Sequence, residues 1–162
     1  MKHLFLALAL ALASAACGPN AAELKTAKET TYKTQPQEMM ELAIDVAKPQ
    51  YGISDVNQEK HIFIAGPKFY GPEGDLESPG AGGFIQMRPH TVIVSFIVEV
   101  VEFGGDDVGV TVTPKTFQTI SGSPKPRELA PDDPNLPPFV LGRANQLALD
   151  IYNEAKPHAY QR

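Results

Sequence analysis

Three histidines and two pairs of aspartates are the side chains of this 162-residue chain best suited to hold a metal ion. The histidines that follow the N-terminal apolar segment are His61, His90 and His158, and no two are separated by two or four residues, so no local ligand pair exists. Asp106-Asp107 and Asp132-Asp133 lack the spacing of a calcium-binding loop. We interpret the histidines as solvated strand ends and the aspartates as turn and loop residues. A site shared by His61 and His90 remains open if their strands are neighbours, but the sequence itself predicts no metal and no cofactor.

Motifs for nucleophilic catalysis are missing from the sequence. No G-x-S-x-G occurs, and Ser95 falls inside a predicted strand, where a sharp nucleophile turn cannot form. Glu99 and Glu102 are three residues apart on the same strand and point to opposite faces, whereas paired catalytic carboxylates must converge on one substrate. We therefore predict no catalytic residues and no enzyme. A periplasmic hydrolase is the least favoured alternative.

The only cysteine, Cys17, directly follows a short apolar leader. Leu4–Ala13 is apolar but too short to span a membrane, and Ser14-Ala15-Ala16 are the small residues that a signal peptidase requires. This arrangement resembles the lipobox of bacterial lipoproteins, in which the cysteine is lipidated and becomes the first residue of the mature chain. Gly18 follows in place of the aspartate that marks inner-membrane retention, so the resemblance implies the outer membrane. Ser14 replaces the usual leucine, which leaves a soluble periplasmic or secreted protein as the alternative.

The chain divides into a signal peptide (1–16), a lipidated cysteine with a flexible tether (17–34) and a single domain (35–162). Residues 17–34 show no apolar periodicity, which is typical of a tether, although a frayed helix over Ala21–Glu29 is possible. The formal net charge of −5 argues against nucleic-acid binding. The expected partners are the membrane, through the lipid on Cys17, and another envelope protein.

The longest β-like segment is Thr91–Phe103. Its even-numbered residues from Val92 to Val100 are all apolar, so they should form one face of a buried strand. Its odd-numbered residues are mixed, with Ile93, Ile97 and Val101 among Ser95 and Glu99.

The remaining elements surround this strand. Apolar spacing predicts a helix over about 36–48, with Thr34 as N-cap and Pro49 as terminator. It also predicts a C-terminal helix with Asn135 as its cap and Pro137 or Pro138 in its first turn, which stops before Pro157. Further strands are predicted at Lys60–Ala65, Phe84–Arg88 and from Val108 to about Ile120, after a Gly-Asp hairpin turn. The short connections between strands require antiparallel pairing. The fold class is therefore α+β, with an antiparallel sheet of about four strands and both helices on one face. This order resembles the helix-flanked domains of accessory outer-membrane lipoproteins, including helix-grip modules.

The odd-numbered face of the central strand is too apolar for a solvated surface and too polar for a second core. Either the predicted loop Pro67–Gly83 covers it from within the chain, or a partner protein does. The predicted partner surface is Phe69, Tyr70, Ile93, Ile97 and Val101. The sequence thus favours a non-catalytic envelope lipoprotein that binds another protein or has a structural accessory role. The alternative is a binding module for a small apolar or lipid ligand.

Overall fold

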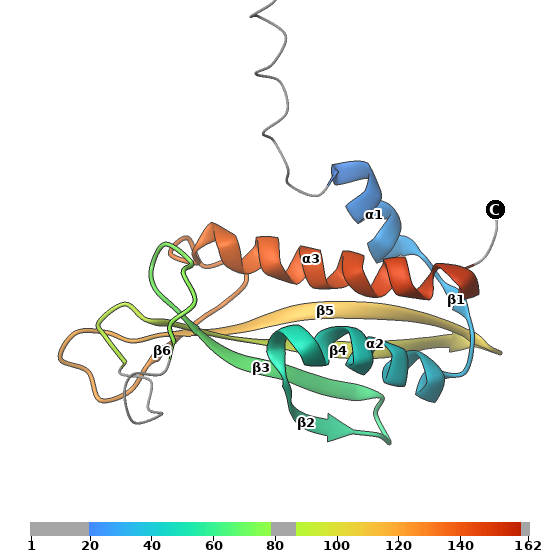
Figure 1. Ribbon diagram of the computed structural model, residues 1–162, viewed down its shortest axis with the longest axis horizontal. Helices are drawn as coiled ribbons and strands as arrows, with labels where there is room; N and C mark the ends of the chain where they lie inside the picture. The colour runs from blue at the N-terminus through green and yellow to red at the C-terminus, as the bar shows by residue number, and fades with distance from the viewer. Residues whose placement is uncertain (1–19, 79–86, 160–162) are drawn as a thin grey trace, which may run out of the picture.

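The computed structural model describes residues 20–78 and 87–159 (Figure 1). Its helices are α1 (Ala21–Glu29), α2 (Pro36–Tyr51) and α3 (Pro138–Ala155), which is followed by a 3-10 turn, η1 (Lys156–His158). Its strands are β1 (Tyr32–Lys33), β2 (Ile53–Asn57), β3 (Ile62–Tyr70), β4 (Val92–Gly104), β5 (Asp107–Gln118) and β6 (Arg127–Leu129). Cys17 and the predicted signal peptide lie outside the described residues.

The strands form one antiparallel sheet, which confirms the α+β class. The order is β1-β5-β4-β3-β2, and β6 pairs with the far end of β5. The described residues contain six strands and three α-helices, so the prediction of four strands and two helices was wrong in number. Sequence periodicity missed β1 and β6 because strands of two and three residues are too short to show an alternation. It did not assign β2 because four of its five residues are exposed, so its sequence has no apolar face.

The helices cover one face of the sheet (Figure 1). α2 packs on β3 and β4, α3 packs on β5 and α2, and α1 packs on α3 and β5. Val92, Val94, Phe96 and Val98 of β4 are fully buried beneath the helices, as the alternation predicted. The ring of Phe96 meets that of Tyr51, the last residue of α2, edge to face with centroids 4.9 Å apart.

The boundaries of α2 differ from those predicted. Pro49 does not end the helix: it lies in the last turn, and the helix continues to Tyr51 before Gly52, at positive φ, ends it. The N-cap is Gln35 rather than Thr34. The Thr34 hydroxyl instead donates to Glu38 Oε2 at 2.7 Å, so it still satisfies a polar group in the first turn.

β3 is longer than predicted, and this changes the position of Phe69 and Tyr70. The prediction ended the strand at Gly66-Pro67, but a bulge accommodates both residues and pairing with β4 resumes at Lys68. Gly66 has φ +101°, and a Cβ there would lie 3.0 Å from the Val94 carbonyl oxygen, so the bulge requires glycine. Phe69 and Tyr70 are thus strand residues, and the prediction that they belong to a loop that covers the sheet was wrong.

The predicted strand Phe84–Arg88 lies mostly outside the described residues, and its last two residues, Met87 and Arg88, are not in a strand.

The described part of the predicted tether is packed against the domain. α1 fits the frayed helix, and its Ala27 is buried. Tyr32 of β1 is 1% exposed and belongs to the core, and burial raises the pKa of its hydroxyl to about 12, with Tyr152 adding to the effect. Residues 20–34 therefore differ from a free linker. Little in the sequence indicates that residues 20–34 pack on the domain, because a single buried tyrosine after an alanine-rich helix produces no periodicity.

Candidate functional site

The histidines do not form a metal site with one another. His61 precedes β3 and lies near the end of β4, where its Nδ1 is 3.4 Å from Glu102 Oε1. His90 precedes the start of β4, whereas the His61 carbonyl oxygen accepts from the Val100 N–H toward the other end of this strand. The two histidines are therefore about ten residues apart along β4, roughly 30 Å at about 3.3 Å per residue. Among residues 20–78 and 87–159, no group of three or more His, Cys, Asp or Glu side chains could hold a metal ion.

The aspartate pairs take part in local turns. The Asp106 carboxylate accepts a hydrogen bond of 2.8 Å from Gln35 Nε2 beside the β4–β5 hairpin. Asp133 accepts from the backbone and side chain of Asn135 and from Arg127, whose Nη2 lies 2.7 Å from Asp133 Oδ2. Hydrogen bonds from Asn135, assisted by the Arg127 charge, hold the pKa of Asp133 below its usual value. These contacts give the carboxylates structural roles in the β4–β5 hairpin and in the loop after β6.

The odd-numbered face of β4 carries an apolar surface that no described helix covers. Cross-strand partners share a face, and the register pairs Ile64 with Ile97, Phe69 with Ile93, and Ile93 with Phe117. All these side chains are half-buried. We call this surface the open face and define it as Ile62, Ile64, Phe69, Ile93, Ile97, Val101 and Phe117.

Polar side chains interrupt and border the open face. Glu99 is exposed between Ile97 and Val101, and Lys115 is exposed on β5 with its Nζ 5.7 Å from the centre of the Phe117 ring. Neither charge is within ion-pair distance of an opposite charge in the described part of the chain. The open face thus combines half-buried apolar side chains with two charges, within it and at its edge, that have no ion-pair partner among the described residues.

Four of the five predicted surface residues lie on the open face: Phe69, Ile93, Ile97 and Val101. Tyr70 does not. It pairs with the buried Val92, is 2% exposed and faces the helices, so it is not available to a partner at this face. The alternation of a strand explains the difference, since consecutive residues point to opposite faces.

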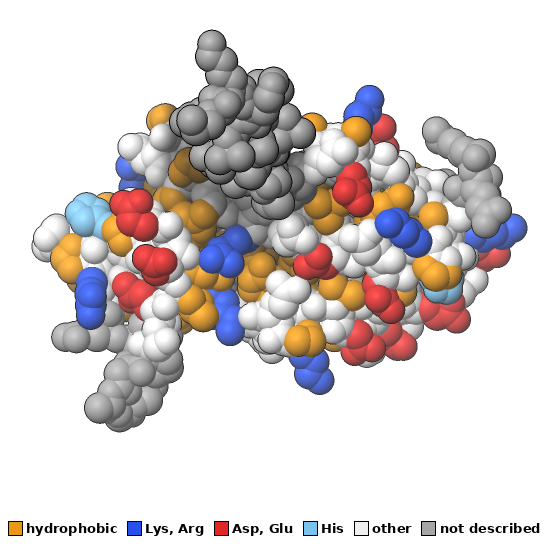
Figure 2. Space-filling model, turned by 45° about the horizontal axis from the view of Figure 1, so that its top comes forward, with side chains coloured by type: hydrophobic (Ala, Val, Ile, Leu, Met, Phe, Trp, Pro, Cys, Tyr) orange, Lys and Arg blue, Asp and Glu red, His pale blue; other side chains and the backbone are white. Residues whose placement is uncertain are grey.

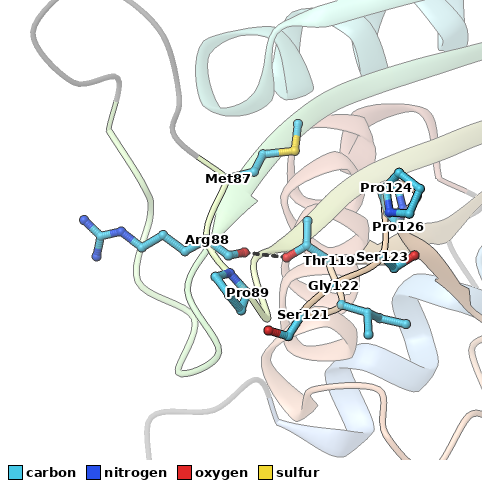
Figure 3. Close-up of a pocket in the computed structure, with 10 residues that line it drawn as sticks. Met87, Arg88, Pro89, Thr119, Ser121, Gly122, Ser123, Pro124 and Pro126 are labelled. Carbon is cyan, nitrogen blue, oxygen red and sulfur yellow. Dashed lines mark hydrogen bonds between the residues drawn. The ribbon is translucent and has the colours of Figure 1, made fainter.

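A surface pocket of about 290 Å³ lies where the loop after β5 meets the segment before β4 (Figure 3). The Thr119 hydroxyl donates to the Arg88 carbonyl oxygen across its floor, and the Arg88 side chain points away from it (Figure 3). Ser123 Oγ donates to the Lys125 carbonyl oxygen at 2.9 Å, and the described residues that line the pocket include no carboxylate or imidazole. These residues therefore offer no general base to activate a hydroxyl.

The outer surfaces of the helices offer a shallow groove between α2 and α3, lined by Leu42, Asp45, Val46, Pro49, Gln50 and Glu154. On the side of the molecule seen in Figure 2, acidic and basic side chains are interspersed, and no continuous basic patch forms among the described residues. This distribution agrees with the negative net charge. It offers no electrostatic footprint for nucleic acid on this side.

The sequence analysis missed a cluster of polar side chains on the helix side of the sheet. Lys68, Tyr70 and Arg143 meet there with Tyr51 around a small cavity. One signal was present in the sequence. Arg143 is three residues after Val140 and four before Leu147, both fully buried, so a cation stands next to the apolar stripe of α3.

Comparison of the chain with models of known protein families, with curated proteins and with solved structures found no match. Within residues 20–78 and 87–159, no helix has both the length and the apolar character needed to cross a bilayer.

Proposed function

We propose that this protein is a non-catalytic accessory protein of the bacterial envelope, which binds another envelope protein through the open face. The observation that carries the proposal is the half-exposed apolar surface on the side of the sheet opposite the helices. Single exposed apolar side chains are ordinary, but a contiguous group rimmed by polar residues is typical of an interaction site.

The composition of the open face indicates what its partner must provide. Ile64 and Ile97 are direct cross-strand neighbours, and Ile93 lies between Phe69 and Phe117 on the adjacent strands. A complementary surface should therefore be flat and apolar. It should also place a cationic or hydrogen-bond donor group near Glu99, because a carboxylate buried without a partner would oppose association.

The proposed location rests on the leader and Cys17. A lipid on Cys17 would hold the domain at the outer membrane, and the short segment between Cys17 and α1 would keep it close to the membrane surface. In that position the half-exposed open face could meet an envelope protein without a conformational change. The catalytic alternative has less support, because none of the described pockets brings a serine or cysteine together with a histidine or carboxylate base.

The test is co-purification from detergent-solubilised envelopes with a variant that removes apolar surface but keeps the strand. Ile93→Thr combined with Ile97→Thr retains β-branched side chains, which suit a strand, and leaves the buried face of β4 intact. Leu141→Gln is the matched control, because Leu141 is an apolar side chain of α3 that is 42% exposed and lies outside the open face.

The proposal predicts that the native protein and the Leu141→Gln variant retain the same co-purifying protein and that the double threonine variant loses it. The melting temperature of the double variant should remain close to that of the native protein, which shows that binding rather than folding is lost. Retention of all partners by a folded double variant would exclude the open face as the binding surface.

A further inference from the structure

The cavity beneath the C-terminal end of α2 gathers cationic and hydroxyl groups from three separate elements. It has a volume of about 110 Å³ and is lined by Gln50, Tyr51, Lys68, Tyr70, Leu76 and Arg143. Tyr51 ends α2, Lys68 and Tyr70 belong to β3, and Arg143 belongs to α3. The cavity lies on the opposite side of the sheet from the open face, so it is independent of the proposed protein contact.

The guanidinium of Arg143 is held in place by its surroundings. Its central carbon lies 4.5 Å from the centre of the Tyr70 ring and 5.9 Å from that of Phe139, and its Nη2 donates to the Gly74 carbonyl oxygen at 3.1 Å. Its Nε is buried without a hydrogen-bond partner among the described residues. The side chain is thus oriented in advance, while part of its hydrogen-bonding capacity is unused.

The positive charge around the cavity is not balanced locally. In the described part of the chain, no carboxylate lies within ion-pair distance of Lys68 or Arg143. The carboxylate of Asp150, which influences Tyr51, accepts hydrogen bonds from Gln50 at 3.1 Å and from Gln146 at 2.8 Å instead. Two cations without a counter-charge, partly withdrawn from water, favour binding of an anion.

The two tyrosines can act as hydrogen-bond donors to such an anion. Burial raises the pKa of Tyr51 and of Tyr70, while the Arg143 guanidinium acts in the opposite direction on both. Both hydroxyls therefore stay protonated at neutral pH. The Tyr51 hydroxyl accepts a hydrogen bond from Arg143, so its own proton is left to donate, and among the described residues neither tyrosine hydroxyl donates to a protein acceptor. A bound anion could accept from them.

We propose that this cavity binds the carboxylate group of a small organic ligand, held by Arg143 and Lys68 with the two tyrosine hydroxyls. Its volume of about 110 Å³ suits a small group such as a carboxylate with one or two attached carbons rather than a large ligand. A phosphate dianion fits less well, because Tyr51 is at the C-terminal end of α2, where the partial negative charge of the helix opposes a second charge. Leu76, 55% exposed, provides an apolar rim for the rest of the ligand.

The experiment uses propionate as the probe and propionamide as its neutral counterpart of the same shape. Backbone amide NMR shifts of the purified protein are followed at constant ionic strength to about 50 mM, because a ligand of about five heavy atoms binds in the millimolar range at best. Propionate should produce saturable shifts around Tyr51, Tyr70 and Arg143. Propionamide should produce none, and inorganic phosphate should bind more weakly than propionate.

Variants identify the groups responsible. Arg143→Met keeps an apolar stem against Tyr70 and should weaken propionate binding about tenfold or more, since it removes a charged hydrogen-bond donor. Lys68→Met should weaken binding about threefold to tenfold, and it provides the test if Arg143→Met does not fold. Lys115→Met is the matched control, because Lys115 is exposed on the open face, and this variant should bind as the native protein does.

The proposal is overturned if propionate produces no saturable shifts, if propionamide binds equally well, or if phosphate binds more tightly. It is also overturned if Lys115→Met weakens binding as much as Lys68→Met. A second titration identifies the source of the carboxylate. If N-acetyl-alanine binds more tightly than propionate and N-acetyl-alanine amide does not bind, the natural ligand is the carboxylate end of a peptide chain. If the two acids bind equally, the ligand is a free small acid.

Discussion

Replacement of Phe96 by alanine should lower the free energy of unfolding by about 3–5 kcal/mol. Phe96 is fully buried at the centre of β4, between Ala65 of β3 and Pro114 of β5, and contacts Tyr51 of α2. The substitution removes the ring from the interface between the sheet and α2. Its neighbour on one side is already alanine, so little side-chain volume is available to fill the space.

The magnitude has two parts. The edge-to-face contact with Tyr51 contributes about 0.5–1.5 kcal/mol, and the lost burial with the resulting cavity accounts for the rest. Phe96→Leu separates them, because leucine restores most of the apolar volume without the aromatic contact. This variant should cost about 1.5 kcal/mol or less.

The assay is urea denaturation followed by circular dichroism, since the chain contains no tryptophan. For an m-value of about 2 kcal/mol/M, a loss of about 4 kcal/mol moves the midpoint down by about 2 M. Ser95→Ala is the control, because Ser95 is the adjacent residue on the other face of β4, and it should change the stability by less than about 0.5 kcal/mol. If Ser95→Ala and Phe96→Ala were equally destabilising, the assignment of the two faces of β4 would be wrong.

Three further predictions concern other parts of the chain. Cys17→Ser should abolish lipid labelling and release the protein from membranes, and sedimentation with membranes after high-salt washing would contradict the lipid attachment. Gly74→Ala should lower the free energy of unfolding by about 1–3 kcal/mol, because Gly74 has φ +92° and a Cβ there would lie 2.9 Å from the Phe139 ring. An unchanged midpoint in urea denaturation would refute this packing. Tyr32→Phe should flatten the alkaline loss of stability. The pKa of Tyr32 is about 12 in the folded state and near 10 in the unfolded state, so the native protein loses stability as the pH rises from about 10 to 12, and urea midpoints between pH 9 and pH 12 measure the difference.

The sequence predicted the part of the fold that shows periodicity. The alternation in β4 correctly separated buried Val94, Phe96 and Val98 from half-buried Ile93 and Ile97, because one long strand repeats its pattern several times. The hairpin turn between β4 and β5 was also predicted correctly from its Gly-Gly-Asp-Asp sequence. Gly104 and Gly105 both adopt the positive φ that such turns require.

Irregular and non-local features could not be predicted in the same way. Gly66-Pro67 has the composition of a strand end, yet the sheet accommodates it in a bulge, and this moved Phe69 and Tyr70 from a loop into β3. The cavity around Lys68 and Arg143 depends on how α3 is placed against β3, and local spacing contains no information about that placement. Only the position of Arg143 beside the buried stripe of α3 indicated an unusual environment.

Photo-crosslinking in intact cells tests the central proposal, contact between the open face and an envelope protein, most directly. A photoreactive residue is placed at Ile97 or Phe117 on the open face, or at Leu141 on α3 as the control. We expect one discrete crosslinked product, common to Ile97 and Phe117 and missing from Leu141. Absence of a product at both open-face positions, or an equal product at Leu141, would contradict the proposed function.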